Sequence, residues 1–211
     1  MNVLRTTIAA LVLLAGLVPA LANGQTPAPT ATPVAAPIAL KIASIAEKKV
    51  RALPPAPFFW RIENLPTLAA AQAAAGEWAL AFEAEGKVWL FTLGPSGGTT
   101  PGATKVADVG PIEPVVADEY LLRVNLASGP PGSVTPVHKH PGSEAYFVLS
   151  GQQSIRTPHG TIRVEAGQPE PGHGAGMIMQ VSSSGTRDLR SLVMFVVDPA
   201  QPFTIPATFP P

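Results

Sequence analysis

Large hydrophobic residues alternate with polar or small residues in short runs along most of the chain, and this two-residue period predicts β-strands. Trp78, Leu80 and Phe82 share one face of such a run. Glu85-Gly86 follows as a turn, and the chain runs back from 87 to 93, which predicts a β-hairpin. Comparable runs predict strands at 58–63, 105–109, 120–126, 177–182 and 190–197, and a second hairpin that turns at 158–160.

One alanine-rich stretch, residues 68–75, favours a short helix, because Thr67 can cap its first turn and Gly76 can end it. Many short strands separated by glycine and proline, with one brief helix, are typical of an all-β fold. The pattern therefore predicts a double-sheet jelly roll or a small β-barrel.

The first residues have the pattern of a targeting signal. Residues 1–22 begin with a basic region around Arg5, continue with an apolar stretch and end in small residues, which predicts a cleavable signal peptide. Residues 23–37 are rich in proline and alanine and lack charge, so we expect a linker. The mature protein is then expected to be periplasmic or secreted, with no membrane segment after signal removal.

Charge and cysteine content narrow the possibilities further. Charged residues make up 13% of the 211 residues and balance to a net charge of zero, so no basic patch favours nucleic-acid binding. The chain has no cysteine, and its stability must therefore come from packing rather than disulfides.

The segment from Gly132 to Gly151 carries the candidate chemistry. His138 and His140, two residues apart, project from the same face of an extended strand. Pro141, Gly142 and Ser143 are expected to form a turn, after which the carboxylate of Glu144 can approach the imidazoles. Two histidines and one carboxylate suit a divalent metal ion such as iron, manganese, zinc or copper, with coordination positions left open.

This segment resembles the first sequence motif of the cupin superfamily, in which glycine, His-x-His, glutamate and a second glycine recur at these spacings. Gly132, His138, His140, Glu144 and Gly151 occupy its fixed places. The resemblance implies a cupin double-stranded β-helix, a jelly-roll barrel, with one short N-terminal helix and a divalent metal in the barrel. We expect a β-rich N-terminal elaboration at 38–115, the barrel core at 116–200 and a proline-rich tail at 201–211.

The second cupin motif is only partly present. Met179 stands where the family usually has a third histidine. Its thioether is a soft, weak ligand, so Met179 is a candidate fourth ligand for copper or else a core residue of a half-buried strand. His173, in the glycine-rich loop before it, is the rival fourth ligand.

Tyr146 shares a strand face with Glu144 and is expected to point into the same cavity, as a proton donor, an orienting group or an ordinary core tyrosine. Phe147 and Leu149 point to the other face. Something must cover them: the opposite sheet, the N-terminal segment or a second subunit, which would make a homodimer.

Two functions remain open. The first is a metal-dependent oxidoreductase of the dioxygenase type acting on a small molecule, with isomerase or lyase chemistry equally compatible with the resemblance. The second is a non-catalytic exported protein that binds a small molecule or the metal itself, which the missing third histidine favours.

Overall fold

The computed structural model describes residues 36–211. The predicted signal peptide at 1–22, and all but the last two residues of the predicted linker at 23–37, lie outside the described residues. Within 36–211, the one helix is far too short to cross a lipid bilayer.

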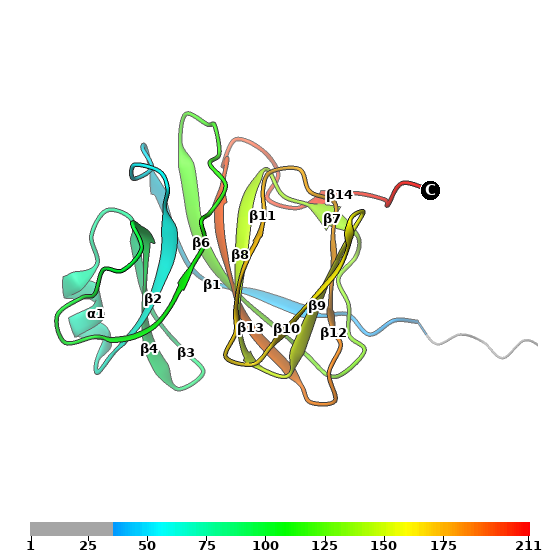
Figure 1. The fold of residues 1–211 in the computed structure, drawn as a ribbon, viewed down its shortest axis with the longest axis horizontal. Coiled ribbons are helices and arrows are strands. Elements are labelled where there is room, and N and C mark those ends of the chain that lie inside the picture. Colours follow the sequence, from blue (N-terminus) through cyan, green and yellow to red (C-terminus); the bar gives the residue numbers. More distant parts are fainter. Residues whose placement is uncertain (1–35) are drawn as a thin grey trace, which may run out of the picture. The chain divides into compact units, whose positions relative to one another are not determined.

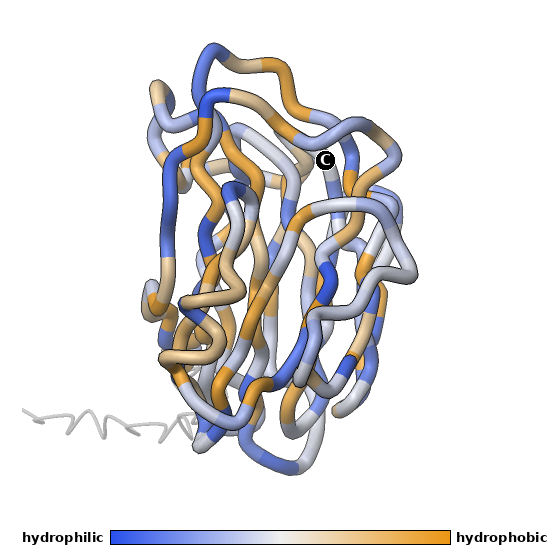
Figure 2. Tube along the Cα trace, turned by 90° about the vertical axis from the view of Figure 1, so that its left-hand side faces the viewer, coloured by the Kyte–Doolittle hydropathy of each residue, from blue (hydrophilic) through white to orange (hydrophobic). Residues whose placement is uncertain are grey.

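A five-stranded antiparallel sheet forms one wall of a barrel (Figure 1). Its spatial order is β1 (Lys41–Val50), β6 (Tyr120–Gly129), β13 (Leu189–Val197), β8 (Gly142–Ser150) and β11 (Pro169–His173). The central strand β13 is buried on both faces, as its apolar run predicts. In Figure 2, hydrophobic segments run along the strands, whereas the turn at the bottom of the view is hydrophilic.

The opposite wall is a three-stranded sheet of β10 (Gly160–Glu165), β9 (Gln152–Thr157) and β12 (Gln180–Ser183). Buried residues from both walls, among them Val148, Ile155 and Val193, form one core cluster between the sheets. A short pair, β7 (His138–Lys139) with β14 (Ile205–Pro206), lies near one end of the barrel. The predicted all-β, double-stranded β-helix architecture with one short helix is confirmed.

A four-stranded sheet covers the outer face of the five-stranded wall. It contains β3 (Ala79–Ala84), β4 (Lys87–Gly94), β2 (Phe59–Leu65) and β5 (Thr104–Val109), with α1 (Leu68–Ala74) beside it. Phe147 of β8 packs edge-on against Trp89 of β4, with ring centroids 6.5 Å apart, and Leu149 packs on the same cluster. The N-terminal segment therefore supplies the cover that these outward residues require, and the homodimer stays a prediction.

Two local predictions are confirmed in this four-stranded sheet and the helix beside it. Thr67 caps α1, since its hydroxyl accepts a hydrogen bond from the Ala70 amide at 3.1 Å. Glu85 and Gly86 both have positive φ, 53° and 71°, as a tight hairpin turn between β3 and β4 requires.

Three segments differ from the sequence-based prediction. β1 lies in the range expected to be N-terminal elaboration, yet it pairs with β6 along the barrel wall. Gly142 and Ser143, expected in a turn, instead begin β8. Both already pair with the end of β13, Gly142 with Val197 and Ser143 with Val196. The glycine-rich loop contains β11, while the strand predicted from 177 is assigned only from Gln180.

Candidate metal centre

His138, His140, Glu144 and Tyr146 line one cavity of about 190 Å³ inside the barrel. The two histidines come from β7 and the residue after it, and the other two come from β8. All four side chains are buried, with between 1% and 8% of their surface exposed. Backbone pairing of β7 with the tail strand β14 holds the histidine segment at this end of the barrel.

Each imidazole is oriented by a backbone carbonyl. His138 Nδ1 lies 2.8 Å from the Pro136 oxygen, and His140 Nδ1 lies 2.5 Å from the Phe203 oxygen. Because a carbonyl oxygen only accepts, Nδ1 carries the proton in both rings. The Nε2 atom of each histidine is thereby left with a free lone pair, the form in which histidine binds metals.

Aromatic rings surround His140. The centroids of the His138, Phe195 and Phe203 rings each lie 4.9 Å from that of His140. Burial lowers the pKa of His140 from 6.5 to about 4, and the Phe203 carbonyl only partly opposes this effect. The imidazole is therefore neutral at neutral pH.

Glu144 is held by Tyr146. The tyrosine hydroxyl donates a hydrogen bond to Glu144 Oε1 and also lies 3.5 Å from the Met179 sulfur. Burial raises the pKa of Glu144 from 4.5 to about 8, although the bond from Tyr146 acts in the opposite direction. Burial and the neighbouring carboxylate raise the pKa of Tyr146 well above 10.0, so this hydroxyl keeps its proton.

The donor types suit a divalent metal, but the donors do not form a closed set. Across residues 36–211, no group of three His, Cys, Asp or Glu side chains stands in an arrangement that could hold a metal ion. Glu144 Oε2 lies 3.8 Å from His140 Nε2. Two donors bound to one ion at about 2.1 Å lie roughly 3 to 3.4 Å apart, so this pair is slightly too wide.

Comparisons with known proteins concern the fold. No protein-family model and no curated protein matches the chain. Among solved structures, a cupin superfamily protein from Desulfitobacterium hafniense aligns at 18% identity over 36% of this chain and 68% of its own, with a TM-score of 0.33. A DMSP lyase from Ruegeria pomeroyi aligns at 24% identity over 41% of this chain and 43% of its own, with a TM-score of 0.36.

A protein with a double-stranded β-helix domain from Klebsiella pneumoniae aligns at 21% identity, covering 41% of this chain and 76% of that protein, with a TM-score of 0.35. The alignment with the DMSP lyase covers 43% of that protein, so this chain spans less than half of the lyase's length. The strand pairing and the first motif, rather than these partial alignments, identify the architecture. The barrel has the cupin fold.

The two candidate fourth ligands occupy different places in this cupin barrel. Met179 is directly paired with His138 by two backbone hydrogen bonds, and its sulfur contacts the Tyr146 hydroxyl. His173 pairs with Glu144 across β11 and β8, but it is not among the residues that line the cavity. Its Nε2 atom is buried and has no hydrogen-bond partner among the described residues.

Sequence reasoning missed Phe203 and Asn125. Phe203 supplies the carbonyl for His140 from a position 63 residues away, and a backbone oxygen leaves no signal in the sequence. Asn125 lies on β6, on the face that lines the cavity. Its alternation with Val124 and Leu126 could have indicated a polar residue pointing into the barrel.

Proposed function

We propose that this cupin binds a divalent metal ion through His138, His140 and Glu144 and acts as a metal-dependent enzyme on a small organic molecule in the barrel. The observation that carries the proposal is the convergence of these three side chains on one cavity, with the Nε2 atoms of both imidazoles free. Such imidazoles are held in the tautomer and orientation that metal sites require.

Charge balance around Glu144 supports a cation at this position. The carboxyl group is buried, and among the described residues its one basic neighbour within 4 Å is His140, which is neutral. Burial without a positive partner raises the pKa of this group to about 8 and keeps it mostly protonated at neutral pH, whereas a bound divalent ion would stabilise the charged carboxylate.

We assign oxygenase chemistry as the first candidate reaction, because two histidines and one carboxylate leave coordination positions open. A divalent ion, when bound, would supply Lewis-acid or redox chemistry to the substrate. The chain's own residues orient and shield: Tyr146 holds the Glu144 carboxylate, and apolar walls such as Val193 and Phe195 exclude water. Tyr146 is in this scheme a positioning residue.

A non-catalytic binding protein is the second candidate. It is favoured by Met179 in the place of the expected third histidine and by the open donor set, since both weaken metal retention. Either function would be exerted outside the cytoplasm if residues 1–22 act as a signal peptide. Fractionation of cells that express the full chain, with the mass of the mature product, tests that export.

Metal content tests the site itself. The mature protein, loaded with Fe(II), Mn(II), Zn(II) or Cu(II) in turn and desalted, should retain close to one ion per chain for at least one of these metals. His138→Ala and His140→Ala should abolish retention, whereas His159→Ala, at an exposed hairpin tip, should not change it. Retention unaltered by either cavity variant would refute the metal centre.

Oxygen consumption separates the two candidate functions. Uptake of dioxygen by the metal-loaded protein with a small aromatic or acidic substrate supports the oxygenase. Full metal occupancy with tight retention of a small molecule, and no oxygen uptake across such a panel, supports the binding protein instead.

A further inference from the structure

The cavity has a second polar group on β6, two strands away from β8 in the five-stranded wall. Val193 of β13 pairs with Tyr146 of β8 on one side and with Asn125 of β6 on the other. All three side chains line the cavity. Since neighbouring strands lie about 4.8 Å apart, Asn125 stands roughly 10 Å across the wall from Tyr146.

Most of the remaining cavity lining is apolar, with Thr135 and Thr204 as its other polar members. It includes Leu40, which precedes β1, and residues of β1, β6, β12 and β13, namely Ile42, Ala127, Val181, Val193 and Phe195. A ligand that fills this space must itself be mostly apolar, with polar atoms near its ends.

Asn125 has a defined orientation. Its side-chain oxygen accepts a hydrogen bond from Arg123 Nε at 2.9 Å, and the Arg123 guanidinium lies over the Phe203 ring, 4.3 Å from the centroid. The amide oxygen is therefore committed, and the amide nitrogen must point elsewhere.

That nitrogen, Nδ2, has no protein partner within residues 36–211, although Asn125 is only 1% exposed. Nδ2 is not completely sealed from solvent, and the Asn125 side chain lines the cavity. A buried amide with two unused donors is unfavourable unless an acceptor arrives. The acceptor must come from the contents of the cavity.

Cavity size limits the ligand. An engineered apolar cavity of about 150 Å³ holds one benzene molecule, and this cavity measures about 190 Å³. The space therefore suits a ring with a single small substituent or an aliphatic molecule of equal bulk.

We propose that Asn125 Nδ2 binds the carbonyl or carboxylate oxygen of such a ligand, and that Asn125 determines its selection over hydrocarbons of the same shape. The inference rests on the proposed function, because the same molecule would present its other end to His138, His140 and Glu144. The ligand class is thus a small, mostly apolar carbonyl or carboxylic compound.

Two probes of equal shape test the proposal. Acetophenone carries a carbonyl oxygen where α-methylstyrene carries a methylene group. Dissociation constants for both are measured by NMR titration on the mature protein. The affinity for acetophenone divided by the affinity for α-methylstyrene should be about fivefold to tenfold higher in the wild type than in Asn125→Asp.

The aspartate variant keeps an oxygen for Arg123 and replaces the donor by an acceptor, so the fold is retained while recognition is lost. Val193→Ala is the matched control, because it changes the same wall without removing a donor. It should alter both affinities and leave their ratio as in the wild type.

An Asn125→Asp ratio equal to the wild-type ratio overturns the proposal, and so does failure of both probes to bind. The titrations are run on metal-free and metal-loaded protein. If the protein retains no metal, the metal centre is refuted. If the metal-free protein still prefers acetophenone, and Asn125→Asp removes this preference, the role of Asn125 is supported independently of the metal.

Discussion

Replacing Phe203 by alanine should loosen the C-terminal tail from the barrel and disturb His140. The Phe203 ring lies 4.9 Å from the rings of both His140 and Phe195, and Arg123 stacks on it at 4.3 Å. The next tail contact is short, since β14 pairs with β7 over two residues only. Phe203 is therefore the main side-chain anchor of this part of the tail.

The magnitude follows from partial burial. Truncating a fully buried phenylalanine costs about 3 to 5 kcal/mol, and Phe203 is only half-buried. We expect the free energy of unfolding to fall by about 2 kcal/mol, of which the lost cation–π contact accounts for roughly 0.5 to 1 kcal/mol. Urea denaturation of the mature protein measures this loss.

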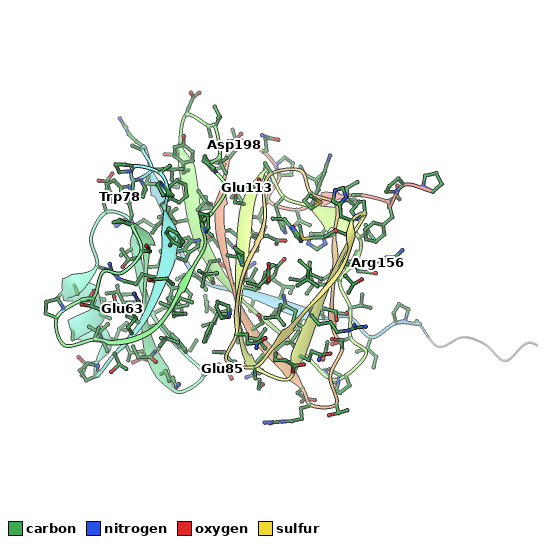
Figure 3. All side chains as sticks on the ribbon, viewed as in Figure 1. Glu63, Trp78, Glu85, Glu113, Arg156 and Asp198 are labelled. Carbon is green, nitrogen blue, oxygen red and sulfur yellow. The ribbon has the colours of Figure 1, made fainter. Side chains whose placement is uncertain are left out.

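Phe209→Ala is the matched control. The Phe209 ring lies over Arg156, 4.3 Å from the guanidinium, and Arg156 is an exposed residue of the opposite barrel wall (labelled in Figure 3). Phe209→Ala should lower the free energy of unfolding by less than about 1 kcal/mol.

A second measurement follows His140 itself. Nitrogen-15 NMR of the imidazole should show the Nδ1-protonated tautomer in the wild type and in Phe209→Ala, and a mixture of tautomers in Phe203→Ala. Equal stability of the two variants, together with an unchanged His140 spectrum, would show that the tail does not hold the histidine.

Other parts of the fold give further tests. Glu63 (labelled in Figure 3) is fully buried and accepts hydrogen bonds from the Thr100 amide and hydroxyl, both at 2.7 Å. Glu63→Ala should therefore lower the free energy of unfolding, measured by urea denaturation, by about 3 kcal/mol. A loss below about 1 kcal/mol would contradict this. A Cβ on Gly142 would lie 2.2 Å from the Val196 carbonyl oxygen, so Gly142→Ala should lower the melting temperature strongly, whereas Gly76→Ala, with open space around it, should not. Burial raises the pKa of Asp108, but hydrogen bonds from Lys105 and Gly97 outweigh it, and the pKa lies below 3.8. Its stabilising effect is therefore present above that value and is lost as the pH falls through the folded-state pKa, so Asp108→Asn should flatten the acid limb of the stability profile.

Features determined by neighbouring residues could be predicted from the sequence. The hairpin at Glu85-Gly86 follows from turn residues between two alternating runs, and the cap of α1 follows from Thr67. The placement of His138, His140 and Glu144 in one cavity lining is similarly local, because seven consecutive residues contain all three side chains. Short-range geometry is sufficient in each case.

Features determined by pairing between distant segments could not be predicted. β11 contains Pro169 and Pro171, which argue against a strand, yet it lies at the edge of the sheet, where a missing amide donor is tolerated. β1 is likewise an edge strand, and its clustered lysines hide the alternation that central strands show. Strand order, which the residues of one segment do not reveal, decides both cases.

Arg123 shows why the selectivity of the site also lay beyond sequence reasoning. Its guanidinium donates to Asn125 and stacks on Phe203, whose carbonyl holds His140. One side chain outside the cavity lining thus connects the Asn125 amide with the residue that orients the His140 imidazole. Because both contacts constrain the same guanidinium, a shift of the tail should change the orientation of the Asn125 amide as well as that of His140. Metal binding and ligand selection would then depend on the same docked tail.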